Sequence, residues 1–546
     1  MKKLILFLSL FWTVSFSYVC GQDNSYSIPL DSAYVINNAV VMRAYGNARE
    51  YVMMPTQYGT NIATGKPLIV VVNSSLTGNV VSIYRISGLD GLVVNDMALG
   101  SNNFIYFGGY RLGKAVYGII DATFSNINVI YDESSQYCKA IAYKNLSGTS
   151  YLFTGDHLTG NSSEISTIYM SGGALYHFYS SYFGDLLSIV DVALSQHSTL
   201  TDTYGISICK LDSYHLALSK NSIQSHQSSI LSRRKLTLPQ YWQWHEGGGS
   251  VERIDNDTYV AVIDVRCDTA EKDGVWFVKF KMVSSIMNIT STRLIEFPTQ
   301  KVFVKDLYYV DTKGGKKLCV AGQYIDNLDS TSWNGCPFIL GIDTNFTNER
   351  VKLFATNYQE YGKRNFTLNK MYYNAPINRL VAVGSYCRYM PTNPTGGIYL
   401  VTSNVFSNTI PQYSCVEVLN VVNNSAVCSY GTINGTSAMH PQWSLNMSFA
   451  SYDTTKNISE DCAPAMLPET KSVSMPSNRH CSVTENALVF HNIDGIVDFV
   501  IYDITGEKVK QGSTSSSINI SSLRKGAYII QISQNKQIVA TEKFVK

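Results

Sequence analysis

The chain has 546 residues, of which 45% are hydrophobic, 15% are charged and 12% are aromatic. This length predicts three or four domains, or one large β architecture with appendages, and the hydrophobic fraction excludes a disordered chain. The 43 Lys and Arg residues against 41 Asp and Glu give a formal charge of +2, which argues against binding to nucleic acid or to anionic membranes through charge alone.

The N-terminal segment has the layout of a secretory signal. Lys2 and Lys3 precede an apolar run over residues 4–16, which is too short to span a membrane. We predict a signal peptide over residues 1–21, with cleavage before Gln22. Lipid attachment at Cys20 is the alternative, although Val19 is a poor neighbour for it. No later segment reaches the length of a transmembrane helix.

The cysteine content is consistent with an oxidising compartment. Without Cys20 ten cysteines remain, an even number that permits full pairing. We predict disulfide bonds between Cys462 and Cys481, between Cys415 and Cys428, and between Cys319 and Cys336. The chain contains no CxxC pair and no recognisable cofactor motif, so we expect neither a structural metal nor a cofactor.

The residue pattern predicts an all-β fold. Short β-branched and aromatic runs, such as residues 68–72, 259–263 and 379–383, are separated by clusters of Gly, Asn, Asp and Ser. This is the pattern of strands joined by reverse turns. No amphipathic helix of 12 or more residues is evident after the signal.

A unit recurs along the chain at spacings of about 45 to 65 residues, which is typical of one propeller blade. It consists of a strand, a tight turn, a strand ending in Gly or another small residue, a longer loop and a further strand. Clear copies begin at residues 94–99, 304–309 and 368–373, and looser ones near Lys139 and Val190.

A single sheet with such apolar strands cannot cover both of its faces, whereas sheets stacked around an axis can. We therefore predict a β-propeller of six or seven blades over residues 27–410, in which Gly108, Gly322 and Gly384 allow neighbouring sheets to approach closely. Two successive β-sandwiches are the alternative. Over residues 411–483 we expect an irregular, disulfide-tied linker, part of which would complete the last blade.

The last sixty or so residues show three local motifs. Tyr502, Asp503, Gly506 and Val509 follow a strand into a tight turn; Leu523, Gly526 and Tyr528 form a second motif; and a Lys-apolar-Lys ending spans Lys543 to Lys546. The segment 484–546 resembles the C-terminal sorting domain of the type IX secretion system. The resemblance implies handling by that secretion machinery, passage through the periplasm and delivery to the cell surface or the medium. A generic immunoglobulin-like module is the alternative.

One segment is chemically distinctive. Tyr241, Trp242, Trp244 and His245 precede three consecutive glycines, and flat aromatic faces beside polar groups suit a sugar ring or a peptide. These four residues are our candidate ligand-binding residues. The alternation of the two Trp residues equally fits a strand that packs between blades.

The remaining polar clusters give no catalytic motif. The Asp-Asn-Asp sequence at residues 255–257 fits either part of a calcium site or, by preference, a turn between strands. We predict an exported protein, surface-attached or released, whose propeller binds a ligand or mediates adhesion. The alternative is a secreted carbohydrate- or peptide-cleaving enzyme with its site in the central pocket of the propeller.

Overall fold

The structure is a computed structural model. It describes residues 24–30, 34–45, 48–57, 65, 67–73, 81–86, 88–158, 162–171, 174–183, 188–199, 202–223, 230–270, 272–284, 286–297, 301–312, 315–325, 335–354, 364–375, 378–388, 395–404, 416–419, 422–425, 430–432, 436–438, 442–448, 459–460, 481–483, 487–490, 495–503, 508–523, 526–534 and 537–546. The chain divides into two compact units, Met1–Ala465 and Met466–Lys546. The regular structure of the described residues is β-strand, apart from the 3-10 turn Ser101–Asn103. The all-β prediction is confirmed.

Antiparallel four-stranded meanders follow one another through the first unit. They consist of β3 (Val40–Tyr45), β4 (Ala48–Met53), β6 (Leu68–Asn73) and β7 (Val81–Arg85); β8 (Val93–Leu99), β9 (Ile105–Arg111), β10 (Lys114–Ile120) and β11 (Asn126–Asp132); β12 (Ser135–Leu146), β13 (Thr149–Leu158), β14 (Ser163–Ser171) and β15 (Ala174–Phe183); β16 (Ser188–Leu194), β17 (Tyr204–Asp212), β18 (His215–Ser222) and β19 (Ile230–Thr237); β20 (Trp242–Arg253), β21 (Thr258–Cys267), β22 (Asp273–Val283) and β23 (Ile286–Glu296); and β24 (Lys301–Thr312), β25 (Gly315–Ile325), β26 (Gly335–Asp343) and β27 (Arg350–Phe354). A short pair, β2 (Tyr34–Val35) and β5 (Thr56–Gln57), lies apart from them.

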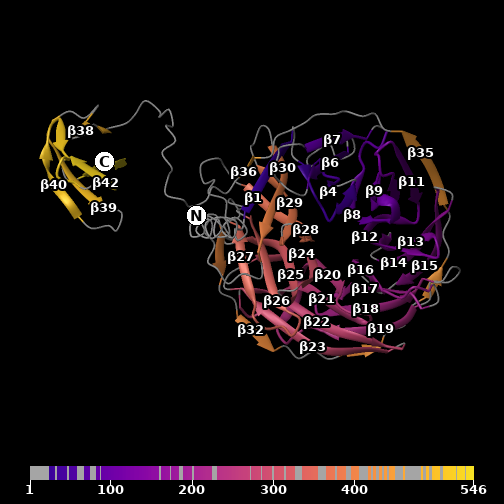
Figure 1. Ribbon diagram of the computed structural model, residues 1–546. Coiled ribbons are helices and arrows are strands. Elements are labelled where there is room, and N and C mark those ends of the chain that lie inside the picture. The colour runs from indigo at the N-terminus through magenta and orange to yellow at the C-terminus, as the bar shows by residue number, and fades with distance from the viewer. Residues whose placement is uncertain are drawn as a thin grey trace, which may run out of the picture. The chain divides into compact units, whose positions relative to one another are not determined.

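The meanders are arranged like the blades of a propeller (Figure 1). The last one has three strands of its own, β28 (Arg364–Asn374), β29 (Arg379–Arg388) and β30 (Thr395–Ser403), and gains a fourth from the N-terminal strand β1 (Asn24–Leu30), which pairs with β30. The first strands of successive meanders contact one another, which places them around the centre.

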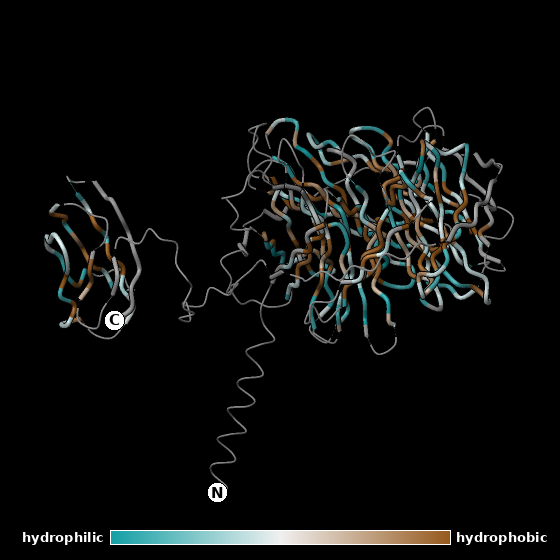
Figure 2. Tube along the Cα trace, turned by 90° about the horizontal axis from the view of Figure 1, so that it is seen from above, coloured by the Kyte–Doolittle hydropathy of each residue, from teal (hydrophilic) through white to brown (hydrophobic). Residues whose placement is uncertain are grey.

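Hydrophobic clusters fill the space between each meander and the next. A further cluster joins the last meander to the first, because Ile398 and Val383 pack with Val40 and Tyr51. Figure 2 shows hydrophobic stretches running along the strands, with hydrophilic stretches at many of the turns. Both faces of each sheet are thus covered by its neighbours, as the burial argument required.

A β-bulge interrupts the first strand of most meanders and determines where the glycines are needed. The bulge in β24 lies between Val304 and Asp306, and Gly322 pairs with Val304 from the second strand. A Cβ at Gly322 would lie 2.0 Å from the Phe303 carbonyl oxygen, and one at Gly384 only 1.8 Å from that of Thr367. These two glycines therefore relieve contacts within their own sheets, which corrects our prediction of an inter-sheet role.

Gly108 has the inter-sheet role that the sequence predicted. A Cβ there would lie 2.5 Å from the Cys138 Sγ and 2.7 Å from a methyl carbon of Ile141, both on the first strand of the next meander. The absence of a side chain thus lets these two sheets approach closely.

The segment predicted as an irregular linker contains six short strands, which is a correction over residues 416–460. After β30 the chain returns along the outer edges of the meanders in reverse order. The pairings are β31 (Val416–Leu419) with β27, β32 (Val422–Ser425) with β23, β33 (Tyr430–Thr432) with β19, β34 (Thr436–Ala438) with β15, β35 (Gln442–Ser448) with β11, and finally β36 (Ser459–Glu460) with β1. We call these strands the belt. Each belt strand covers a sheet edge that would otherwise expose unpaired backbone groups.

The predicted disulfide between Cys319 and Cys336 does not form. Cys319 is a buried free thiol, and its neighbour on β26 is Gly341, whereas Cys336 pairs with Tyr324. The strands are adjacent as expected, but their register separates the two sulfurs, and burial raises the pKa of the Cys319 thiol to about 12. The other two predicted pairs involve Cys415, Cys428 and Cys462, which lie outside the described residues.

The second unit contains two facing antiparallel sheets. One has β37 (Cys481–Val483), β38 (Ala487–Phe490) and β41 (Ser517–Asn519); the other has β40 (Lys508–Thr514), β39 (Val497–Asp503), β42 (Ala527–Gln534) and β43 (Gln537–Val545). Leu488 and Ile518 from the first sheet share a core with Phe499, Ile501 and Ile530 from the second. This is the small sandwich that the sequence predicted, and β37 extends it to the N-terminal side of residue 484.

Candidate functional site

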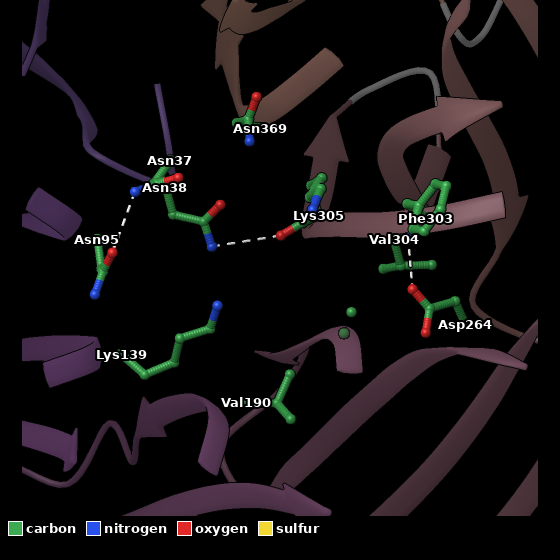
Figure 3. A pocket seen from close by; sticks show the side chains of 12 residues that line it. Asn37, Asn38, Asn95, Lys139, Val190, Asp264, Phe303, Val304, Lys305 and Asn369 are labelled. Carbon is green, nitrogen blue, oxygen red and sulfur yellow. Dashed lines mark hydrogen bonds between the residues drawn. The ribbon is translucent and has the colours of Figure 1, made fainter. Parts of the chain in front are cut away.

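A polar cavity of about 180 Å³ lies at the centre of the ring of sheets (Figure 3). Its walls come from segments far apart in the sequence: Asn37, Asn38, Asn95, Lys139, Val190, Gly248, Gly249, Asp264, Phe303, Val304, Lys305 and Asn369. Every meander contributes at or just before its first strand. Four amides, two ammonium groups and one carboxyl group therefore give this cavity a predominantly polar wall.

The bulges place these side chains. Asn95, Lys139, Val190, Lys305 and Asn369 are each the extra residue at the bulge of a first strand. A bulge re-aims the side chain of its extra residue away from the regular alternation of the strand. The repeated deformation of the innermost strands is therefore what lines the cavity.

In β20 the interruption is longer. Trp244 pairs with Val265 and Gly249 pairs with Ile263, so four residues are inserted opposite Asp264. A Cβ on Gly248 would lie 2.2 Å from an Asp264 carboxylate oxygen, so the wide bulge requires this glycine.

Hydrogen bonds between neighbouring segments fix the amides of the cavity. Asn37 Nδ2 donates to Asn95 Oδ1 at 3.1 Å, and Asn95 Nδ2 donates to the Cys138 carbonyl at 2.7 Å. Asn38 Nδ2 donates to the Lys305 carbonyl at 3.4 Å. These three amide side chains are thus held in fixed orientations by their neighbours.

Next to the bulge residues lies a group of ionisable side chains that we call the central acidic cluster: Asp96, Asp191, Glu252 and Asp306, with Lys370 among them. Lys370 Nζ lies 3.5 Å from Asp306 Oδ1 and 3.8 Å from Asp96 Oδ1. The cluster therefore contains a partly desolvated ion pair network.

The aspartates of the cluster also tie three pairs of neighbouring meanders together. Asp96 Oδ2 accepts a hydrogen bond from the Ile141 N–H, Asp191 Oδ2 from the Val251 N–H and Asp306 Oδ2 from the Met371 N–H, each at 2.8 Å. Each donor lies two residues after a cavity-lining residue of the neighbouring strand. Cavity geometry and ring assembly thus depend on the same carboxylates.

Burial dominates the protonation of this cluster. It raises the pKa of Asp96 to about 7 and that of Asp306 to about 6, although Lys370 opposes the shift in both. Burial and the nearby Asp306 raise the pKa of Glu252 to about 8. Burial alone would lower the pKa of Lys370, but Asp306 and Asp96 outweigh it and raise that pKa well above its ordinary value.

The predicted aromatic segment lies at the start of β20. Trp242 and Trp244 have exposed fractions of 7% and 2% and belong to the core shared with the preceding sheet, which is the location expected by the packing alternative. Tyr241 is 57% exposed, in a left-handed conformation with φ 71°. The backbone of His245 lies in the wide bulge of β20. The ligand-binding role of these four residues stays a prediction.

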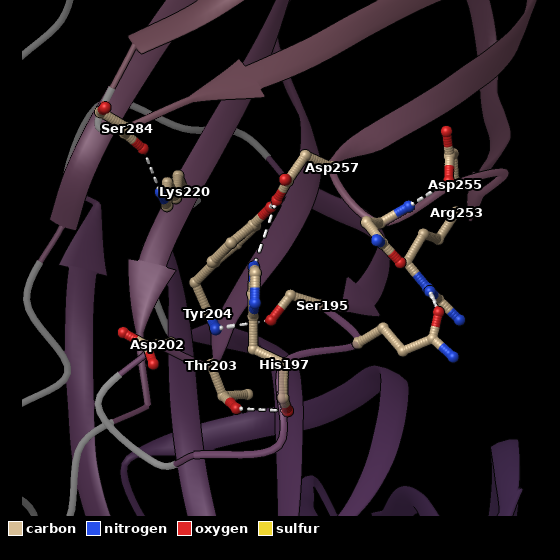
Figure 4. A network of polar contacts seen from close by, with 12 residues as sticks. Ser195, His197, Asp202, Thr203, Tyr204, Lys220, Arg253, Asp255, Asp257 and Ser284 are labelled. Atoms are coloured by element: carbon tan, nitrogen blue, oxygen red, sulfur yellow. Dashed lines mark hydrogen bonds and ion pairs between the residues drawn. The ribbon is translucent and has the colours of Figure 1, made fainter.

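The Asp-Asn-Asp sequence forms a turn before β21, as the preferred interpretation expected. Asp257 Oδ1 accepts a hydrogen bond from the Tyr204 hydroxyl at 2.8 Å and lies 3.2 Å from His197 Nε2 (Figure 4). Asp255 accepts a hydrogen bond from the Asn256 N–H at 2.8 Å. Among the residues that the structure describes, no three His, Cys, Asp or Glu side chains are arranged to hold a metal ion.

Sequence reasoning found the repeat but missed the cavity. The clear repeats open with the sequences VNDM, VKDL and LNKM, and the second residue of each is a cavity residue: Asn95, Lys305 and Asn369. A polar residue recurring at the same position of an otherwise apolar strand was the available signal. In a regular strand such a polar position would be unexplained. A β-bulge explains it, because the bulge re-aims the side chain of its extra residue.

The motif residues of the second unit meet at one end of its sandwich. Lys546 and Gly526 exchange backbone hydrogen bonds of 3.0 and 3.2 Å, and Lys546 Nζ donates to the carbonyls of Ser521 at 2.7 Å and Leu523 at 2.6 Å. The C-terminal residue is therefore attached to the turn that holds the second motif. At this end of the sandwich, Lys546 is therefore joined by hydrogen bonds to Leu523 and Gly526 of the second motif.

The first motif pairs with the second across two strands. Tyr502 and Asp503 lie opposite Ile529 and Tyr528 in the β39–β42 pair, and Lys543 pairs with Ile529 from β43. Gly506 lies outside the described residues.

Comparison with solved structures gives distant likenesses. The β-propeller domain of Vanderwaltozyma polyspora Nup133 has 8% identity and a TM-score of 0.37, covering 67% of this chain and 100% of that one. The phage phi92 endosialidase has 9% identity and a TM-score of 0.36, covering 96% and 87%. Drosophila Semaphorin 2a has 10% identity and a TM-score of 0.26, covering 94% and 98%. At these TM-scores the likenesses do not by themselves establish a fold.

Comparison of the sequence gives one specific result. No curated protein matches the chain, whereas residues 476–546 match the family model of the secretion system C-terminal sorting domain. In the described part of the chain no helix has the length and apolar character needed to cross a membrane. The chain ends in a type IX secretion C-terminal sorting domain and is an exported protein, secreted or displayed at the cell surface.

Proposed function

We propose that the chain is an exported ligand-binding protein whose ligand enters the central cavity of a seven-bladed propeller. The count of seven blades is supported by seven successive meanders, the last completed by β1. It is also supported by hydrophobic packing between the last meander and the first. The sorting domain would deliver this propeller to the cell surface or the medium, where it meets its ligand.

The observation that carries the proposal is the convergence of polar side chains from every blade on one cavity. Lys139 is exposed to solvent and Lys305 is half-buried, so both ammonium groups are accessible to a ligand. Lys139 and Lys305 are extra residues at bulges that serve no regular strand pairing, and both line the cavity. Their placement is accounted for if they bind a ligand.

The enzyme alternative has weaker support. Hydrolysis of a glycosidic bond usually requires two carboxyl groups on either side of the bond. Among the described residues lining the cavity, Asp264 is the sole carboxyl, and its Oδ2 accepts a hydrogen bond from the Val304 N–H at 3.2 Å. This arrangement favours binding without cleavage.

The test is calorimetric titration of the full chain without its signal segment against neutral sugars, acidic sugars and short peptides. Val190→Phe places a larger side chain in the wall of the cavity and reduces its volume. Val283→Phe makes the same change at a position that is 48% exposed. We expect Val190→Phe to reduce binding at least tenfold and Val283→Phe to leave it unchanged. Asn38→Leu provides a second cavity variant should Val190→Phe lower the melting temperature.

Two outcomes would overturn the proposal. Binding that is equally strong in both cavity variants would place the ligand elsewhere, and release of a cleaved product from any bound polymer would favour the hydrolase.

A further inference from the structure

We infer that the central cavity binds a sugar acid, a single pyranose ring with one carboxylate, and that Lys139 and Lys305 hold that carboxylate. This inference rests on the proposed function and specifies its ligand class. It follows from the charge, the hydrogen-bonding capacity and the size of the cavity.

The charge of the cavity wall comes first. Lys139 and Lys305 line the cavity, and within the described part of the chain no carboxylate lies within ion-pair distance of either ammonium group. In the acidic cluster beside them, Asp306 and Asp96 are in contact with Lys370 instead. Two ammonium groups in one small cavity favour an anion between them.

The electrostatics of Lys139 agree with this assignment. Its pKa lies below the ordinary value because the surrounding sheets desolvate it and because the charge of Lys305 repels its own. Asp96 and Asp191 act in the opposite direction, and the effect of each one alone does not exceed that of Lys305. A bound carboxylate would relieve the repulsion between the two lysines and favour the charged form of Lys139.

The amides supply the complementary half of the site. Asn38 uses its Nδ2 on the Lys305 carbonyl, which leaves its Oδ1 as an acceptor. Asn369 uses its Oδ1 on the Thr367 hydroxyl at 2.7 Å, which leaves its Nδ2 as a donor. A sugar hydroxyl both donates and accepts, so a ring of hydroxyl groups matches this mixed set better than an acyclic carboxylate does.

An aromatic ring and the cavity volume narrow the ligand further. The partly exposed side chain of Phe303 lines the cavity, and in Figure 3 it lies on the same side as Val304 and Asp264. Its ring offers an apolar face to the C–H groups of a pyranose. The cavity volume of about 180 Å³ is more than ten times the roughly 15 Å³ that a single water molecule needs, so the cavity has room for a pyranose ring.

The experiment is calorimetric titration of the full chain without its signal segment, with sodium glucuronate, glucose and succinate as probes at low salt. We expect glucuronate to bind at least tenfold more tightly than glucose or succinate. Lys139→Met and Lys305→Met should each weaken glucuronate at least tenfold and should affect glucose, which has no carboxylate, much less. Lys316→Met, an exposed change on the partner strand of β24, is the matched control and should have no effect.

The charge mechanism has its own readout. Because the charged form of Lys139 binds the anion, glucuronate binding should take up protons, and its affinity should fall as the pH rises through the lowered pKa of Lys139. Titration in buffers of different ionisation enthalpy measures this uptake. Lys139→Arg keeps a positive charge that does not titrate, so it should retain more glucuronate affinity than Lys139→Met and should abolish the proton uptake, which separates loss of charge from loss of fold.

The outcomes distinguish this inference from the proposed function. Glucose binding as tight as glucuronate, with no effect of either lysine variant, would overturn the sugar acid and leave the cavity as a binding site. Succinate or an acidic peptide binding as tightly as glucuronate, with the same lysine dependence, would overturn the sugar ring. Cavity-independent binding of every probe would overturn both proposals.

Discussion

The sorting domain and the centre of the propeller are both built from recurring residue patterns, but they differ in how the residues lie along the chain. In the sorting domain Leu523 and Gly526 are close in sequence and Lys546 contacts both. In the propeller each blade supplies between one and three residues, from Asn37 to Asn369. A motif read along the sequence therefore reveals the first kind of site and conceals the second.

The largest effect should follow from removing the sorting domain. Deletion of residues 476–546 removes the matched family segment and leaves the propeller unit, Met1–Ala465, in place. We expect surface or medium delivery to fall below detection while the protein retained in the cells still binds ligand. Fractionation with immunoblotting measures the first result and calorimetry the second. Unchanged delivery would contradict the role of this domain.

The next largest effect concerns the centre of the ring. Lys370→Met would remove the ammonium group that lies within ion-pair distance of both Asp96 and Asp306. The two buried carboxyl groups would then lack the cation that they share. Loss of one partner from a buried ion pair costs about 3–5 kcal/mol, which denaturant unfolding near pH 8 would measure. Lys316→Met, at an exposed position, is the control and should not change the unfolding midpoint.

The pH dependence sharpens this test. The folded-state pKa values of Asp96 and Asp306, about 7 and about 6, lie above their unfolded value, so the folded state holds more protons and stability falls as the pH rises through them. The cost of Lys370→Met should therefore shrink below about pH 6, where both carboxyls are neutral. A cost that does not depend on pH would contradict the ion pair network.

A third test compares glycines from the two regions. Gly384→Ala places a Cβ 1.8 Å from the Thr367 carbonyl oxygen, beside the bulge that positions Asn369, whereas Gly526→Ala meets nothing nearer than the Tyr528 ring at 3.8 Å. We expect Gly384→Ala to cost about 1–3 kcal/mol and to weaken ligand binding. Gly526→Ala should leave unfolding unchanged. Equal tolerance of both changes would show that the bulge does not require glycine.

The last test concerns the slope of stability against pH rather than the stability at one pH. Burial and the neighbouring Glu164 raise the pKa of Asp156 to about 8, so its contribution to stability is lost as the pH rises from about 4 to about 8. Asp156→Asn should remove a slope of up to about 1.4 kcal/mol per pH unit and be more stable than the parent at pH 9. Asp90→Asn, at an exposed position, should leave the slope unaltered.

Much of the fold was readable from the sequence because its causes are local. Alternating apolar runs and turn residues identified the strands, and the spacing of the repeats predicted blades. The belt escaped prediction because its strands have only two to seven residues, and most of them, such as β33 (Tyr430–Thr432), are too short to show an apolar period. What fixes each of them is a backbone edge left open by a blade far earlier in the chain.

The candidate site was less predictable for a related reason. The Trp residues of β20 attracted attention as chemically distinctive, yet their indoles pack between sheets. Asn95, Lys139 and Asn369 look ordinary one at a time, and only the bulges and the ring closure bring them together. Their shared position within the repeat was the sequence signal, but its meaning depends on a distortion of the strand that residue type alone does not specify.

The most direct test of a single cavity built by all blades is a crystal structure of the full chain without its signal segment, grown with sodium glucuronate. The account predicts one sugar acid at the centre of the ring, with its carboxylate within hydrogen-bond distance of the Nζ atoms of Lys139 and Lys305 and its ring against Phe303. The account would be contradicted if glucuronate bound on another face of the protein. It would also be contradicted if the side chains of Lys139, Lys305 and Phe303 did not line one common cavity.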